Sequence, residues 1–128
     1  MENRKYTRLN LDVMAEVHLP DGSCLYGETA DLSLDGAFVS LAPPRGLSNG
    51  ERCRLLLILK SHDNWVKTEF QASIAHVKED GVGLRFEQAN IKHHEAFLKL
   101  LIDGADNIDV LLEELSGNPR KEFAFIDR

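Results

Sequence analysis

The sequence has few cysteines and no long hydrophobic run. Cys24 and Cys53 are the only cysteines among 128 residues, which excludes a disulfide-rich scaffold. The longest apolar run, Leu55 to Leu59, is far shorter than the roughly 20 residues of a membrane-spanning helix. The first residues also lack the apolar stretch of a signal peptide. We therefore expect a cytoplasmic protein with two reduced cysteines and no insertion into a membrane.

Positive charge is also scarce. The chain carries 15 Lys and Arg against 21 Asp and Glu, a formal net charge of −6. Non-specific binding to a nucleic acid polymer depends on many Lys and Arg that neutralise phosphates, so we expect no such partner. The exception is the N-terminus, where Arg4, Lys5 and Arg8 lie within ten residues. This local excess predicts a small anion site rather than an extended basic surface.

Catalytic motifs are missing as well. The chain has no Gly-x-Ser-x-Gly elbow, no Walker loop and no His-Glu-x-x-His sequence, so we expect neither an enzyme nor a cofactor. His93 and His94 are adjacent, and adjacent side chains on a helix point about 100° apart, so they do not converge on one ion. We expect structural or surface roles for all five histidines and no metal site.

Hydrophobic alternation dominates the first two thirds of the chain. Residues 9–19 alternate strictly, with every odd position apolar, which predicts a strand with one buried face. Turn residues separate further predicted strands at 24–30, 37–41, 53–59, 65–77 and 82–86. Val77 falls out of phase with Ile74, which predicts a bulge near Ala75 and His76. Six short strands with frequent turns predict an all-β core, namely a six-stranded antiparallel β-barrel.

Helical spacing replaces alternation after residue 90. Apolar residues from Ile91 to Ile102 fall on one side of a helix, and Asp103-Gly104 is expected to end or kink it. The spacing from Ile108 to Leu115 predicts a second helix with Asp106 as its N-cap. This second helix packs on the barrel or offers a surface to a partner or a second copy, and the sequence does not decide between these.

Two short motifs carry side chains suited to one ligand. Arg4 and Arg8 form an Arg-x-x-x-Arg pattern before the first strand, and Asp31, Ser33 and Gly36 form an Asp-x-Ser-x-x-Gly pattern between two strands. The arginine guanidinium forms bidentate hydrogen bonds with phosphate oxygens and stacks on aromatic rings. A carboxylate accepts hydrogen bonds from the N–H groups of guanine. A serine hydroxyl bonds phosphate or base, and glycine allows close approach of backbone. The set predicts a site for a guanine nucleotide with phosphodiester links.

The order and spacing of these motifs resemble the PilZ domain family of cyclic di-GMP receptors. Residues 81–86, Gly-Val-Gly-Leu-Arg-Phe, resemble a late strand of that domain, and the likeness covers about residues 3–100. The resemblance implies a split six-stranded barrel with one or two C-terminal helices. It also implies a ligand held between the N-terminal arm and the barrel, and contacts from the five motif residues.

Further expectations rest on the same resemblance. Asn3, Lys5 and Gly83 are candidate accessory contacts, and Asn3 stands where several relatives that bind two stacked ligands have Arg, which favours one ligand per site. The resemblance divides the chain into a ligand-binding arm (1–8), a barrel with its following helix (9–102) and a C-terminal helical extension and tail (103–128). Ligand binding would be relayed by a conformational change to an effector protein. The alternative is a nucleotide-independent adaptor that binds protein only, and the oligomeric state stays open.

Overall fold

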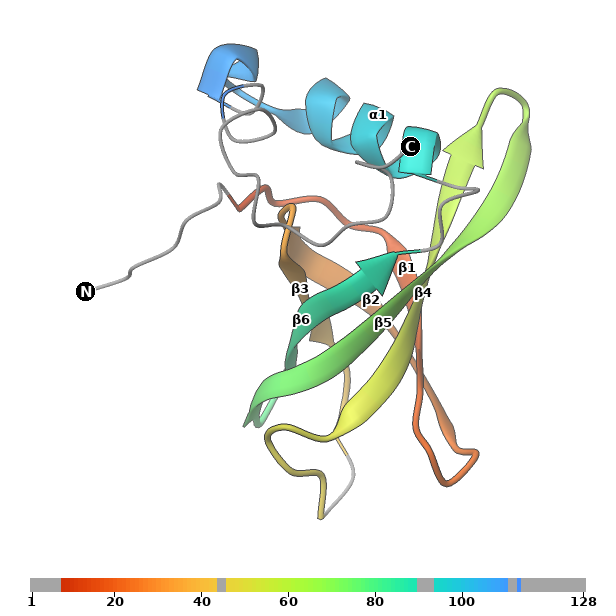
Figure 1. Cartoon of the computed structure of the whole chain (residues 1–128), viewed down its shortest axis with the longest axis vertical. Helices are drawn as coiled ribbons and strands as arrows, with labels where there is room; N and C mark the ends of the chain where they lie inside the picture. Colours follow the sequence, from red (N-terminus) through yellow and green to blue (C-terminus); the bar gives the residue numbers. More distant parts are fainter. Residues whose placement is uncertain (1–7, 44–45, 90–93, 111–112, 114–128) are drawn as a thin grey trace.

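A closed antiparallel barrel forms the body of the protein. The computed structural model describes residues 8–43, 46–89, 94–110 and 113. Within them, β1 (Met14–His18), β2 (Cys24–Leu32), β3 (Gly36–Ser40), β4 (Arg52–Ser61), β5 (Asn64–Lys78) and β6 (Gly81–Ala89) precede helix α1 (His94–Gly104). The strands pair in the order β1-β2-β3-β6-β5-β4, and pairing of β1 with β4 closes the barrel (Figure 1). The predicted six-stranded antiparallel class is confirmed.

Alternating apolar residues fill the barrel, as the sequence predicts. The odd positions of the first segment are buried from Val13 to Leu19, and the core continues through the inward faces of the other strands. Phe70, Leu55 and Leu57 have no exposed surface, and burying a side chain of this size contributes about 1.5–3 kcal/mol. Cys53 is buried in the same core and Cys24 is partly exposed; both are free thiols, as expected.

The first predicted strand is shorter than expected. Strand β1 begins only at Met14, whereas the alternation begins at Leu9. Between these residues, the backbone forms hydrogen bonds with a side chain. The Thr29 hydroxyl donates to the Leu11 carbonyl and accepts from the Val13 N–H. Leu9 then rejoins the sheet through an isolated bridge to Leu32. The inward apolar positions of residues 9–13 are kept, although the hydrogen-bond ladder between strands is not continuous there. A period of two in the sequence therefore overestimates the length of this strand.

Two further features of the sheet bear on the site. The predicted bulge in β5 is confirmed, because the register of β5 against β6 shifts between Ile74 and His76. An unpredicted bulge lies in β2, where the register against β3 shifts between Thr29 and Asp31. Strand β2 also continues through Asp31 to Leu32, so the predicted interruption at residues 31–36 is reduced to the loop 33–35.

Helix α1 lies across one end of the barrel (Figure 1). Phe97 packs edge-on against Phe70, with ring centroids 4.9 Å apart, and also against Phe86 at 6.0 Å. The helix ends at Gly104, as predicted, where Leu11 lies against the glycine. No helix among the described residues is long and apolar enough to cross a membrane.

The second helix is described in part. Residues 108–110 are helical, and the remainder of the predicted segment lies mostly outside the described residues. The Asn107 side-chain oxygen accepts the Val110 N–H at 3.2 Å, which is the bond an N-cap residue makes. The prediction of Asp106 as the cap is therefore wrong by one residue. The shift arises because Asp and Asn are both good caps and the sequence places them side by side.

Candidate functional site

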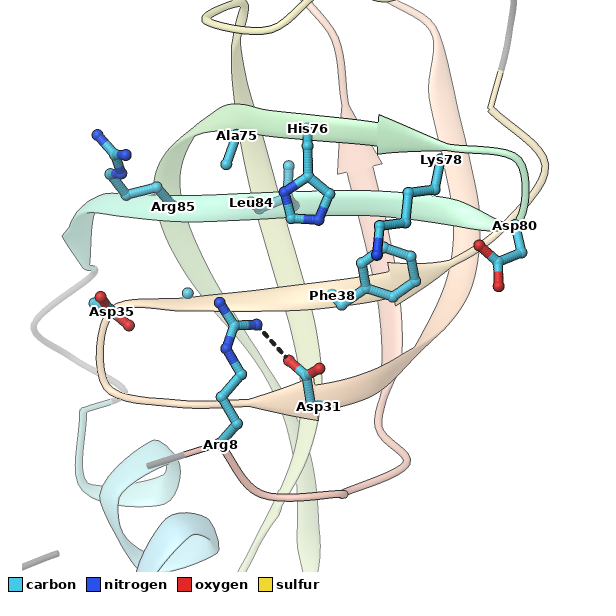
Figure 2. Close-up of a pocket in the computed structure, with 11 residues that line it drawn as sticks. Arg8, Asp31, Asp35, Phe38, Ala75, His76, Lys78, Asp80, Leu84 and Arg85 are labelled. Atoms are coloured by element: carbon cyan, nitrogen blue, oxygen red, sulfur yellow. Dashed lines mark hydrogen bonds and ion pairs between the residues drawn. The ribbon is translucent and has the colours of Figure 1, made fainter. Parts of the chain in front are cut away.

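Arg8 and Asp31, one residue from each predicted motif, meet on the barrel. The Arg8 guanidinium donates to an Asp31 carboxylate oxygen at 2.9 Å, and both side chains are about a quarter exposed, at 27% and 23% (Figure 2). Arg8 is held there by its neighbour, because Leu9 and Leu32 exchange two backbone hydrogen bonds of 2.8 and 2.9 Å. The buried Leu9 and Leu32 side chains anchor this bridge in the core. The segment before β1 is therefore fixed to β2 beside Asp31.

The bulge in β2 accounts for the direction of the Asp31 side chain. Thr29 pairs with Val39 and Asp31 pairs with Phe38, so Ala30 is an extra residue in this strand. A bulge re-aims the side chains that follow it. Thr29 is buried, whereas Asp31 is partly exposed and faces Arg8. In a regular strand without the bulge, Asp31 would lie on the same face as Thr29, two positions earlier.

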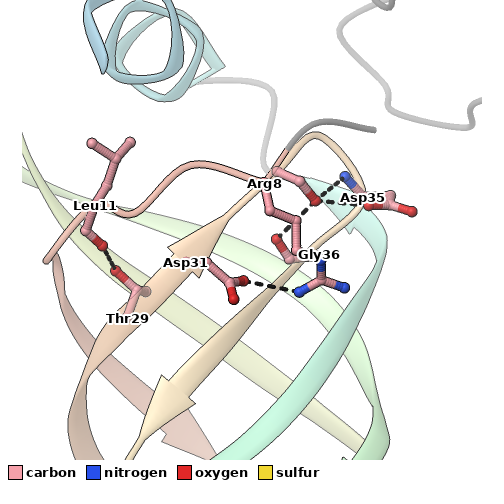
Figure 3. Close-up of polar contacts among 7 residues, drawn as sticks. Arg8, Leu11, Thr29, Asp31, Asp35 and Gly36 are labelled. Carbon is pink, nitrogen blue, oxygen red and sulfur yellow. Dashed lines mark hydrogen bonds and ion pairs between the residues drawn. The ribbon is translucent and has the colours of Figure 1, made fainter. Parts of the chain in front are cut away.

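Ser33 is the first residue of the loop that joins β2 to β3, the loop that also carries Asp35 (Figure 3). The residue is 1% exposed, and its hydroxyl donates to the Asp35 carboxylate at 2.7 Å. The Gly36 carbonyl lies 3.3 Å from the same hydroxyl, and the Ser33 N–H donates to that carbonyl at 2.9 Å. Ser33 thereby shapes the loop and orients Asp35, and its own hydroxyl is turned away from the solvent.

Gly36 opens β3 directly against β6. A Cβ at this position would overlap the Leu84 carbonyl oxygen, so the glycine is needed for close approach of two strands. The sequence-based expectation assigned this freedom to the approach of a ligand. Gly83 has a related role, because a Cβ there would overlap the His76 ring. This expected accessory residue lies beneath His76 and lets the imidazole rest flat on β6.

A pocket of about 660 Å³ lies over the outer faces of β2, β3, β6 and β5 (Figure 2). Such a volume is typical of small-molecule sites. Its lining includes three cationic and three acidic side chains, namely Arg8, Lys78, Arg85, Asp31, Asp35 and Asp80. Gly36, Ala75 and Leu84 also line it. The lining is balanced in charge, unlike the acidic chain as a whole.

One wall of the pocket is aromatic. The rings of Phe38 and His76 are stacked, with centroids 6.0 Å apart and planes inclined by 21°. The Lys78 ammonium lies 5.8 Å from the Phe38 ring centroid, within the range of a cation–π contact. Pairing of Phe38 with Gly83, and of Gly83 with His76, brings these side chains together across β3, β6 and β5. The wall offers flat apolar surface beside charged groups.

The predicted residues are therefore placed in three ways. Arg8, Asp31 and Gly36 line the pocket, while Ser33 and Gly83 lie beneath its surface. Asn3, Arg4 and Lys5 lie outside the described residues. Sequence reasoning missed the walls of the pocket, because they come from β5, β6 and the middle of β3. The local signals were the predicted bulge at Ala75 and His76 and the position of Arg85 within the Gly-Val-Gly-Leu-Arg-Phe strand.

Comparison with known proteins gives both a family and a fold. The model of the PilZ domain matches residues 2–103. No curated protein matches the chain in sequence. The Bacillus subtilis inhibitor of motility MotI/DgrA matches with a TM-score of 0.66 and 18% identity, over 80% of this chain and 51% of that one. This chain thus spans about half the length of that protein.

Two further solved structures are similar over more of this chain. The PilZ domain of Escherichia coli YcgR, solved with c-di-GMP, matches with a TM-score of 0.57 and 20% identity, over 94% of this chain and 99% of that one. The MrkH–c-di-GMP complex of K. pneumonia matches with a TM-score of 0.61 and 16% identity, over 91% and 55%. At these identities, the likeness establishes a shared fold.

Proposed function

Because this chain belongs to the PilZ domain family, we propose that it is a receptor for cyclic di-GMP. The ion pair between Arg8 and Asp31 in the lining of the pocket is the observation that carries the proposal. It unites one residue from each predicted motif at a site of suitable size. Solved structures of similar fold include two proteins in complex with the same dinucleotide.

The chemistry of the pair fits the ligand. Cyclic di-GMP combines two guanine bases with two phosphodiester groups. Arg8 has five N–H donors in a rigid fork, so its bond to Asp31 leaves donors for a phosphate or for guanine O6 and N7. A carboxylate has about four acceptor positions, and those of Asp31 that do not face Arg8 suit the N1–H and N2–H edge of guanine. The two motif residues thus serve opposite edges of one base or neighbouring parts of one nucleotide.

The remaining pocket groups support the same ligand. Lys78 and Arg85 add positive charge near the pocket, where two phosphodiesters must be held against a net charge of −6. Phe38 and His76 supply a flat surface on which a purine can stack. Gly36 keeps β3 close to β6 beneath the site. We propose that Ser33 acts by orienting Asp35. It does so either instead of contacting the ligand itself or before it makes such a contact.

We also propose that the N-terminal arm completes the site and passes the signal on. Arg4 lies four residues before Arg8 and would add the second guanidinium, with Asn3 and Lys5 beside it. Binding would order the arm over the ligand and change the surface offered to an effector protein. The proposed activity is binding and relay, without catalysis.

Isothermal titration calorimetry with cyclic di-GMP tests the proposal. Wild-type protein is expected to bind with a dissociation constant of about 10 µM or tighter, and Arg8→Ala and Asp31→Ala to lose most of that affinity. Arg54→Ala is the matched control, because Arg54 pairs with Glu69 at 3.2 Å on β4 and β5 without lining the pocket. Cyclic di-AMP tests whether the guanine edge is read.

Two results would overturn the receptor proposal. One is the absence of binding heat for folded wild-type protein at about 100 µM ligand. The other is equal affinity in wild type, Arg8→Ala and Asp31→Ala. Absence of binding would favour the adaptor function, and a pulldown that is indifferent to the nucleotide would then identify its partner.

A further inference from the structure

Three side chains of types that can bind a metal ion converge on the outer face of the β1–β2 hairpin, away from the pocket. They are Glu16 and His18 of β1 and Cys24 of β2. Glu16 and His18 are two residues apart and so share one face of the strand. His18 pairs directly with Cys24 in the antiparallel register, which places these two side chains opposite each other. The hairpin thus assembles a carboxylate, an imidazole and a thiol from residues that the sequence separates.

The distances match those around a tetrahedral metal ion. His18 Nε2 lies 3.0 Å from Glu16 Oε1 and 3.5 Å from Cys24 Sγ, and all three atoms lie within 4.8 Å of one another. Zinc binds sulfur at about 2.3 Å and nitrogen at about 2.0–2.1 Å, so at the tetrahedral angle these two atoms are about 3.5 Å apart. The corresponding nitrogen–oxygen separation is about 3.4 Å. The two distances from His18 Nε2 are therefore within a few tenths of an ångström of those around a shared ion.

Hydrogen bonds among the three side chains explain their distances less completely than a shared metal ion does. A single imidazole nitrogen, Nε2, faces both Glu16 and Cys24. That nitrogen carries at most one hydrogen and can donate well to only one partner. A metal ion between the three atoms would bond to all of them at once. The convergence of the three atoms on one point is the arrangement that a shared metal ion requires.

We propose that Glu16, His18 and Cys24 form a binding site for a divalent ion of the zinc class. Thiolate and imidazole ligands favour zinc and similar transition metals over magnesium or calcium, which prefer oxygen. Three protein ligands leave a fourth position open to water or to a group from a partner. The proposal departs from the sequence-based expectation that none of the histidines binds metal. It is independent of the cyclic di-GMP proposal.

Neighbouring residues hold the cluster in place. Lys67 of β5 lies 3.1 Å from Glu16 Oε2, the oxygen that does not face His18, and so fixes the carboxylate from behind. Outer contacts of this kind orient metal ligands. The turn between the strands is closed by two backbone bonds, from Leu19 to Ser23 and from Gly22 to Leu19. Glu16 and His18 are only 15% and 28% exposed, so their side chains have little freedom to lose when they bind.

The site is also separate from the pocket. The pocket uses Asp31 near the end of β2, seven positions after Cys24, together with β3, β5 and β6. None of the three metal-binding residues lines it. Zinc binding can therefore be measured without nucleotide, and its failure would leave the receptor proposal untouched.

Titration of untagged protein with Zn²⁺ tests this proposal, using a chromophoric chelator as competitor. One ion per chain is expected, and Cys24→Ser or His18→Gln is expected to weaken binding at least about 100-fold, since even outer-shell changes cost about 10–100-fold. Co²⁺ should give the near-ultraviolet absorption of a cobalt–thiolate bond in wild type and not in Cys24→Ser. His62→Asn is the matched control, because His62 is an exposed histidine in the β4–β5 turn with a φ of 57° that Asn tolerates.

A second measurement uses wild-type protein alone. Bound Zn²⁺ is expected to slow the reaction of Cys24 with a thiol reagent, and a strong chelator should restore the rate. The proposal is overturned if wild type binds no Zn²⁺ at about 10 µM, or if Cys24→Ser binds as tightly as wild type. Unchanged thiol reactivity at saturating Zn²⁺ would also overturn it.

Discussion

Gly36→Ala is expected to reduce both the stability of the barrel and its affinity for cyclic di-GMP. The new Cβ would overlap the Leu84 carbonyl oxygen, and no side-chain rotation can relieve a clash with backbone. Gly36 pairs with Arg85, and the Phe86 N–H donates to the Asp35 carbonyl, so β3 and β6 must separate. Overpacking costs about 1–3 kcal/mol, and the reduced freedom of the unfolded chain offsets about 0.4–1 kcal/mol. The net loss is about 1–2 kcal/mol, or about 3–10 °C in Tm.

Gly27→Ala is the matched control for this prediction. Its Cβ would meet the Ser40 carbonyl oxygen in the same way, but Gly27 does not line the pocket. Both variants should lose similar stability in thermal unfolding followed by circular dichroism. Only Gly36→Ala should lose affinity in calorimetry below the transition, by about tenfold for one misplaced hydrogen bond. An unchanged Tm in Gly36→Ala would refute the steric argument, and equal affinity in both variants would refute the role of Gly36 in the site.

Three further outcomes follow from the structure. Burial raises the pKa of the Cys53 thiol to about 11, so at pH 8 about one molecule in 1000 carries its thiolate; a thiol reagent should label Cys24 quickly and Cys53 only on unfolding. Phe97→Ala removes the ring that packs on Phe70 and Phe86, and urea unfolding should show a loss of about 3–5 kcal/mol. Cyclic di-GMP affinity should fall as salt rises from about 50 to about 200 mM, because the cations proposed to hold the phosphates are partly exposed; a constant affinity in calorimetry would contradict this.

The strands were predictable because burial on one face leaves a period of two in the sequence. Alternation identified all six, and the phase change at Val77 identified a bulge. It failed from Leu9 to Val13, where the side chain of Thr29 supplies hydrogen bonds that a strand would otherwise supply. A threonine 16 positions away from Val13 leaves no local trace in that segment. The predicted N-cap of the second helix was wrong by one residue, because neighbouring Asp and Asn cap a helix almost equally well.

The candidate site was predictable only where motifs are local. Arg8 and Asp31 were identified from short patterns, and the structure brings them together. Phe38 and His76 were not, because they meet only through the order β3-β6-β5, in which β6 lies between strands that precede it in sequence. Ser33 shows that finding a motif does not determine what its side chain contacts. Its motif was found, but whether its hydroxyl faces outward or supports Asp35 depends on a loop geometry that residue types do not determine.

The energetics of Arg8 decide whether its bond to Asp31 would hinder a ligand. An ion pair that is about a quarter exposed contributes roughly 0–1 kcal/mol, because water solvates both charges well when they separate. A charge-assisted hydrogen bond to a phosphate or base contributes about 1.5–3 kcal/mol. The position of Arg8 does not depend on the pair, since the Leu9–Leu32 bridge holds the backbone next to it. Exchange of Asp31 for a phosphate would therefore favour the proposed ligand, and before binding the pair would keep both side chains directed at the pocket.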